Sequence, residues 1–145
     1  MIHYILIANW PSGIICFSHY FDGVIPSQHR NSFEKDIIGK CIDQVGGSKD
    51  SEIRGPADEF CLARRDGLLL TILGADKTVS EALIKEVLHV FTDTLYNQLK
   101  CSTEKLVLQN KTIIREILTQ MISHGKIIET RPSHILSSLK TLLVD

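Results

Sequence analysis

The chain has 145 residues, of which 43% are hydrophobic and 23% charged, with a formal net charge of -1 at pH 7. This length predicts a single domain, residues 1–145, and the composition excludes a disordered chain. The small net charge gives no attraction to a phosphate backbone, so nucleic acid is not an expected partner. No run approaches the roughly 18 apolar residues of a membrane span, and four cysteines without a C-x-x-C pair fit a reducing cytosol. We therefore expect a cytoplasmic protein that reaches membranes only through partners.

The first half of the sequence combines β-rich runs with one helical segment. Pro11 and Gly13 separate the first two runs, and Asp66-Gly67 separates the last two, which predicts a hairpin at each place. Apolar residues spaced three and four apart from Phe33 to Val45 predict a helix, and the polar stretch 48–51 predicts a surface loop. The predicted strands are residues 2–8, 14–21, 52–54, 59–65 and 68–75.

The second half of the sequence has helical spacing throughout. Ser80 is the predicted N-cap of a helix of about twenty residues with one apolar stripe. A second helix covers residues 113–122 and is predicted to end at His124-Gly125, where glycine can adopt the left-handed conformation. A last helix begins near Ser133.

This order of elements predicts the fold class. The runs 2–8 and 68–75 are the most continuously apolar and belong at the centre of a sheet that is covered on both faces. We expect an α/β (α+β) fold: a five-stranded, mainly antiparallel sheet between one helix on one face and a helical pair on the other, plus a C-terminal helix. The later helices carry more large aliphatic residues than one sheet face can cover, which favours a partner interface.

The sequence offers little that could carry catalysis. Cys16 and His19 have the residue types of a nucleophile and its base, but three positions apart on a strand they are predicted to point to opposite faces. His3 and His19 could approach each other across the first hairpin, yet no third ligand lies at useful spacing. We therefore expect no catalytic residue, no metal site, no cofactor and no small-molecule substrate. The enzyme alternative, a cysteine-dependent hydrolase, predicts that a thiol-directed probe labels Cys16 selectively.

Four blocks of the sequence carry a likeness to a known family. They are MIHYILIANWPSGIICFSHYF, SEIRGPADEFCLARRDGLLLTILGAD, VLHVFTDTLYNQLK and IIREILTQMISHGKIIETRPSHILSSL. In this order they resemble the longin domains of the small (sigma, zeta) and medium (mu) chains of clathrin adaptors and coatomer. The last block resembles the N-terminal domain of medium chains most, with these residues in register: Gly125, Glu129, Thr130, Ile135 and Leu136. This combination of small-chain and medium-chain features resembles a divergent small chain, for instance the small subunit of a TSET or plant TPLATE-type complex.

The resemblance implies both a fold and a role. The fold would be longin-like (profilin-like), and the chain would be the non-catalytic small subunit of a heterotetrameric adaptor complex. Such a subunit acts in vesicle trafficking and endocytosis at coated pits, where it packs against a large adaptin-like chain beside a medium chain. The resemblance thus places it in the cytoplasm, peripherally at membranes or coated vesicles. The alternative is a stand-alone longin module of a tethering or small-GTPase-regulating complex.

The resemblance also directs attention to one candidate peptide site. In some adaptor small chains, a basic residue near the start of the second strand and an apolar pocket beside the long helix bind acidic dileucine peptides. Here that strand opens Ile14-Ile15-Cys16, without a basic residue. The corresponding pocket positions would be Leu68, Thr92 and Val107, together with Cys101, Ser102 and Lys105. Burial of each leucine would supply roughly 1.5 to 3 kcal/mol, so polar walls at Thr92, Ser102 and Lys105 would remove much of the affinity. We expect that this chain does not bind dileucine cargo.

Overall fold

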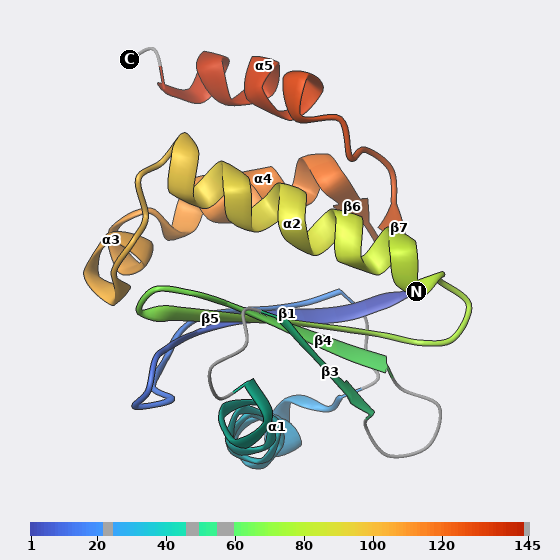
Figure 1. Ribbon diagram of the computed structural model, residues 1–145. Coiled ribbons are helices and arrows are strands. Elements are labelled where there is room, and N and C mark those ends of the chain that lie inside the picture. Colours follow the sequence, from blue (N-terminus) through green and yellow to red (C-terminus); the bar gives the residue numbers. More distant parts are fainter. Residues whose placement is uncertain (22–24, 46–49, 55–59, 144–145) are drawn as a thin grey trace.

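The computed structural model describes residues 1–21, 25–45, 50–54 and 60–143 (Figure 1). Within these ranges the elements, in chain order, are β1 (Ile2–Asn9), β2 (Ile15–Tyr20), a 3-10 turn (Ser27–His29), α1 (Arg30–Val45), β3 (Asp50–Arg54), β4 (Phe60–Asp66), β5 (Leu69–Ala75), α2 (Glu81–Asn97), α3 (Glu104–Gln109), α4 (Lys111–Met121), β6 (Ile122–Ser123), β7 (Lys126–Ile127) and α5 (Pro132–Leu143). None of the described helices is long and apolar enough to cross a membrane.

The five long strands form one antiparallel sheet in the order β2-β1-β5-β4-β3. The two most apolar runs, β1 and β5, lie next to each other at the centre, with Leu6 opposite Ile72. Every residue of β5 is buried, and so is every residue of β1 except Asn9. Such strands need cover on both faces, and this confirms the predicted sheet.

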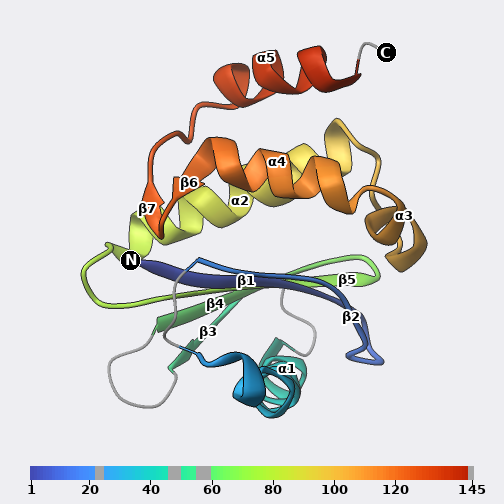
Figure 2. The same ribbon diagram turned by 180° about the vertical axis from the view of Figure 1, so that it is seen from behind.

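Helices cover both faces of the sheet (Figures 1 and 2). On one face Ile37 and Ile38 of α1 pack with Leu6 and Ile72. On the other face α2 and α4 supply residues such as Phe91 and Ile117 to a larger cluster that includes Ile5 and Leu73. In both views α5 is the outermost layer, and Ile135 inserts into the larger cluster with 1% of its surface exposed. The expected arrangement, one helix against a helical pair and a further C-terminal helix, is confirmed.

Side-chain caps fix where two helices begin. The Ser80 hydroxyl accepts a hydrogen bond from the Leu83 amide at 3.2 Å, so Ser80 is the N-cap of α2 as predicted. The Thr103 hydroxyl accepts one from the Leu106 amide at 3.4 Å and starts α3. Helix α3 was not predicted, because a six-residue helix is too short to show helical periodicity.

The segment after α4 corrects one prediction. The helix ends at Met121, and His124-Gly125 form the tip of the small β6–β7 hairpin rather than a helix end. Both residues have positive φ, 50° and 81°, as a type I′ turn requires. The hairpin packs on the sheet, because the Gly125 carbonyl accepts a hydrogen bond from the Ile2 amide at 2.7 Å. A Cβ on Gly125 would lie 2.8 Å from the Ile2 oxygen, so this close approach needs glycine.

Several strand boundaries also differ from the prediction. Asp50 and Ser51 belong to strand β3 rather than to a loop, since they pair with Arg64 and Ala63 of β4. Ile14 precedes β2, and Leu68 lies in the turn before β5. Main-chain pairing sets these limits, and residue type alone does not reveal it.

Candidate functional site

The predicted peptide site lies at the end of the sheet where the β4–β5 turn meets α2 and α3. Its three main positions differ in exposure. Leu68 is 53% exposed, and its carbonyl accepts a hydrogen bond from the Trp10 amide at 2.7 Å. Thr92 on α2 is buried, and Val107 on α3 is part of the larger hydrophobic cluster. Of these three side chains, only that of Leu68 is available to a partner at the surface.

The remaining predicted positions surround the start of α3. Cys101 is buried, and its thiol lies 3.8 Å from the carbonyl oxygens of Leu99 and Leu106. Ser102 and Lys105 are exposed. The surface of this region therefore consists of polar Ser102 and Lys105 together with Leu68, while Val107 and Cys101 are buried in the core.

An ion-pair network, which the sequence analysis did not identify, joins the β4–β5 hairpin to α2. The Arg64 guanidinium donates from Nη1 to the Thr92 hydroxyl at 2.7 Å, and its Nε lies 3.2 Å from Asp66 Oδ2. Its Nη2 lies 3.3 Å from Asp93 Oδ1. Tyr96 completes the link by donating its hydroxyl proton to the Asp66 carbonyl.

This network assigns Thr92 a structural role. Its hydroxyl accepts from Arg64 and lies 2.9 Å from the Leu88 carbonyl, to which it donates. Thr92 is thus a buried bridge between strand and helix rather than a pocket wall. Arg65, the next residue along, behaves differently, because its guanidinium stacks 4.4 Å from the centre of the Trp10 ring.

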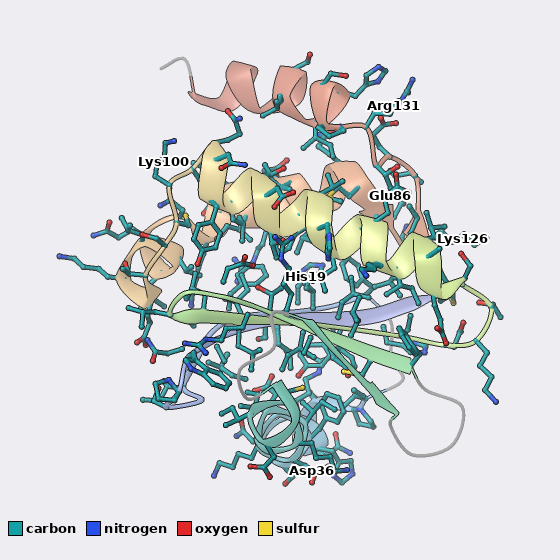
Figure 3. All side chains as sticks on the ribbon, viewed as in Figure 1. His19, Asp36, Glu86, Lys100, Lys126 and Arg131 are labelled. Carbon is teal, nitrogen blue, oxygen red and sulfur yellow. The ribbon has the colours of Figure 1, made fainter. Side chains whose placement is uncertain are left out.

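Cys16 and His19 do not point to opposite faces, and the reason is a β-bulge. Ile7 pairs with Phe17 and Ala8 pairs with Ile15, so Cys16 is an extra residue that interrupts the alternation of β2. Cys16 joins the cluster under α2 and α4, and Figure 3 shows His19 in the same layer. The geometric reason for rejecting the pair is therefore wrong, since alternation holds only in an unbulged strand.

The chemistry of Cys16 still does not resemble that of a nucleophile. Burial, followed by the charge of Glu104, raises the pKa of its thiol to about 12. The thiol donates to the Ile7 carbonyl at 3.4 Å rather than to a base. His19 stacks edge-on against Phe21, and burial, together with the charge of Arg115, lowers its pKa. These groups lack the thiolate and the paired base that cysteine catalysis requires.

Thiol labelling separates this interpretation from the enzyme alternative. All four cysteines lie in the described part of the chain, where they are buried and form no disulfide. The pKa of Cys41 is raised chiefly by its hydrogen bond with Cys61, and that of Cys101 by burial. Because the thiolate is the reactive form, iodoacetamide near neutral pH should label Cys16 at least about a hundredfold more slowly in the native protein than in denaturant. Peptide mass spectrometry measures this ratio, and fast, selective labelling of native Cys16 would support the hydrolase instead.

The two histidines considered as metal ligands lie in different surroundings. His3 Nε2 is 3.9 Å from Asp76 Oδ2, whereas His19 lies beside Phe21. Within the described ranges, no group of three or more His, Cys, Asp or Glu side chains is arranged to hold a metal ion.

Comparisons with known proteins place this geometry in context. The sequence pattern of the family described as "Clathrin adaptor complex small chain" matches residues 1–144. The chain is 28% identical over 145 residues to the "AP-4 complex subunit sigma" of Dictyostelium discoideum, covering 97% of this chain and 96% of that protein. It is 25% identical over 142 residues to the "AP-4 complex subunit sigma-1" of Homo sapiens, covering 98% and 96%.

A comparison of shapes agrees with the sequence comparisons. A chain of the "Homology model of the full-length AP-3 complex in a stretched open conformation" superposes with a TM-score of 0.80 at 16% identity. The match covers 98% of this chain and 93% of that chain. At this identity the likeness concerns the fold alone, and it confirms the longin-like architecture expected from the sequence blocks.

Proposed function

This chain belongs to the clathrin adaptor complex small-chain family, and we propose that it packs against a large adaptin-like chain within a heterotetramer that also contains a medium chain. It is a small adaptor subunit with a role in vesicle trafficking. The extent of the family match carries the proposal, because residues 1–144 include every described element from β1 to α5. A match of this extent favours the adaptor subunit over a stand-alone module.

We further propose that the chain acts without catalysis and reaches membranes through its partners. Buried thiols, with the pKa of Cys16 at about 12, support the first point. The match to a family of coat subunits supports the second, and a cytoplasmic location follows from it. The resulting mechanism is a scaffold: a rigid domain whose core is made internally and whose outer surface holds a larger chain in place.

The adaptor role does not extend to dileucine cargo in this proposal. Thr92 is engaged by Arg64 and Val107 is buried, so neither presents an apolar wall at the surface. The purified complex should therefore show no saturable binding of a fluorescent acidic dileucine peptide, as measured by anisotropy. Saturable binding that is lost on Leu68→Asp would contradict this expectation.

Affinity isolation from the organism's own cells tests the proposed function. The tagged small chain should recover two large helical-repeat chains and one medium chain in equal amounts, as quantified by mass spectrometry. The control is an unrelated small protein with the same tag, expressed at the same level. Repeated isolation without any large chain, and in particular with a small GTPase in its place, would reject the adaptor assignment.

A further inference from the structure

Some exposed apolar side chains lie on the later helices, as predicted, and others lie elsewhere. Within the described ranges, the exposed large hydrophobic side chains are Met1, Ile14, Leu68, Leu108 and Ile128. None of them lies on α2 or α4, because the sheet and α5 cover the apolar stripes of these helices. The most exposed is Ile14, at 60%, directly before the edge strand β2.

Ile14 borders a groove of about 300 Å³ between the β1–β2 turn and α1. Ile15 and Ile38 extend its apolar lining, and Asn31, Glu34 and Lys35 line the α1 side. We call this hollow the β2–α1 groove. Since Ile38 is buried while Ile14 is largely exposed, the groove runs from the surface to the core under α1.

The wall of the groove is held in place by close packing of Gly13. This residue has φ of 77°, and a Cβ there would lie 3.1 Å from Ile38 Cγ2 and 3.2 Å from Ile42 Cδ1. The β1–β2 turn therefore rests directly on α1. A larger residue at position 13 would push the turn and the helix apart. The groove is thus preformed rather than dependent on a flexible side chain.

The strand next to the groove has an open edge. β2 is the outermost strand on its side of the sheet, and its described partner is β1 alone. The Phe21 amide donates to the His3 carbonyl at 2.9 Å, so alternation turns the main-chain groups of Ser18 and Tyr20 away from β1. An outward row of N–H and C=O groups is a template for another extended segment.

The charges beside the groove favour an acidic partner. Glu34 Oε2 accepts a hydrogen bond from the Tyr20 hydroxyl at 2.5 Å, and the Arg30 guanidinium lies 4.1 Å from the centre of the Tyr20 ring. Lys40 pairs with Asp36 at 3.1 Å. Lys35 is exposed and forms no ion pair with any residue of the described part of the chain. A carboxylate of a partner would complement this cation.

We propose that the outer edge of β2 and the β2–α1 groove together bind an extended segment of the large adaptin-like chain. The segment pairs with the main chain of Ser18 and Tyr20, places a large aliphatic side chain in the groove against Ile14, and sets a carboxylate against Lys35. This assignment rests on the proposed function, because it names the surface through which the small chain holds its large partner.

Binding of the large chain from the same organism to surface variants tests the proposal. Ile14→Asp and Lys35→Glu should each weaken binding by about tenfold or more, since each removes one element of the complementarity. Ser18→Pro should weaken it as well, because it removes an outward N–H. The matched controls are Ile128→Asp, whose side chain is 57% exposed, and Lys126→Glu, also exposed; both should bind within about twofold of the unaltered chain. Thermal unfolding confirms that every variant is folded.

The outcomes distinguish the proposed function, which is binding to a large chain, from the proposed docking surface on β2 and α1. If the unaltered chain binds and the three groove variants bind equally well, the docking surface lies elsewhere and the proposed function stands. If the unaltered chain does not bind the large chain at all, the proposed function fails and this inference with it. If sedimentation shows a homodimer that Ile14→Asp dissociates, a second copy occupies the edge and the inference is overturned.

Discussion

Replacement of Arg64 with methionine is expected to lower the free energy of unfolding by about 3 kcal/mol. Arg64 is buried, and its guanidinium faces Asp66 at 3.2 Å and Thr92 at 2.7 Å. Methionine fills most of the volume of the arginine side chain, but it leaves the Asp66 carboxylate, which is 15% exposed, without its cation. The expected loss of unfolding free energy is smaller than the largest losses seen when a buried ion pair is broken. The reason is that the other carboxylate, Asp93, is 58% exposed and can be solvated.

The neighbouring residue provides the control for Arg64. Arg65→Met removes the same charge from a half-exposed guanidinium that stacks on Trp10 4.4 Å from the ring centre. It should lower stability by no more than about 1 kcal/mol. Urea unfolding measures both losses, and the slope of the unfolding free energy against urea concentration should be the same for both variants and the unaltered chain. Equal losses for the two variants would mean that the network between β4 and α2 adds nothing to stability.

Replacement of Gly74 with alanine is expected to lower the free energy of unfolding by about 2 to 3 kcal/mol. Gly74 lies in β5 opposite Tyr4 of β1, and a Cβ there would lie 2.2 Å from two atoms of the Tyr4 ring. The ring is not free to move away. It packs edge-on against Phe33 at 4.9 Å between centroids, and its hydroxyl donates to the Cys61 sulfur at 3.4 Å.

Gly39 is the matched control for Gly74. It lies on the exposed side of α1, and a Cβ there would meet nothing within 4 Å. Gly39→Ala should therefore stabilise the protein by up to about 1 kcal/mol, because alanine favours the helix. Thermal unfolding of both variants gives the comparison. A neutral Gly74→Ala would show that the Tyr4 ring can reorient, so that the space above Gly74 is not required.

The sequence predicted the sheet well because its signals were strong. Continuous apolar runs placed β1 and β5 at the centre, and Asp66-Gly67 marked a hairpin. The bulge at Cys16 was not predicted, because no residue type in this strand marks the position of one extra residue. For the same reason Cys16 and His19 were assigned to opposite faces.

The candidate site was harder to predict than the fold. Arg64 and Arg65 are adjacent and alike in sequence, but strand alternation buries the first beside Asp66 and leaves the second on Trp10. Thr92 suggested a polar pocket wall, whereas the Arg64 partner that explains its burial lies 28 residues away along the chain. Such contacts depend on the tertiary packing of α2 on the sheet, and local sequence patterns do not contain it.

Native mass spectrometry of the complex isolated from cells shows whether this chain is an adaptor subunit. We expect one copy of this chain in an assembly with two large chains and one medium chain. Gentle activation should release the small chain together with a large chain, because those two are in contact. A spectrum that contains this chain only as a monomer, as a homodimer or bound to a small GTPase would rule out its role as the small subunit of such a complex.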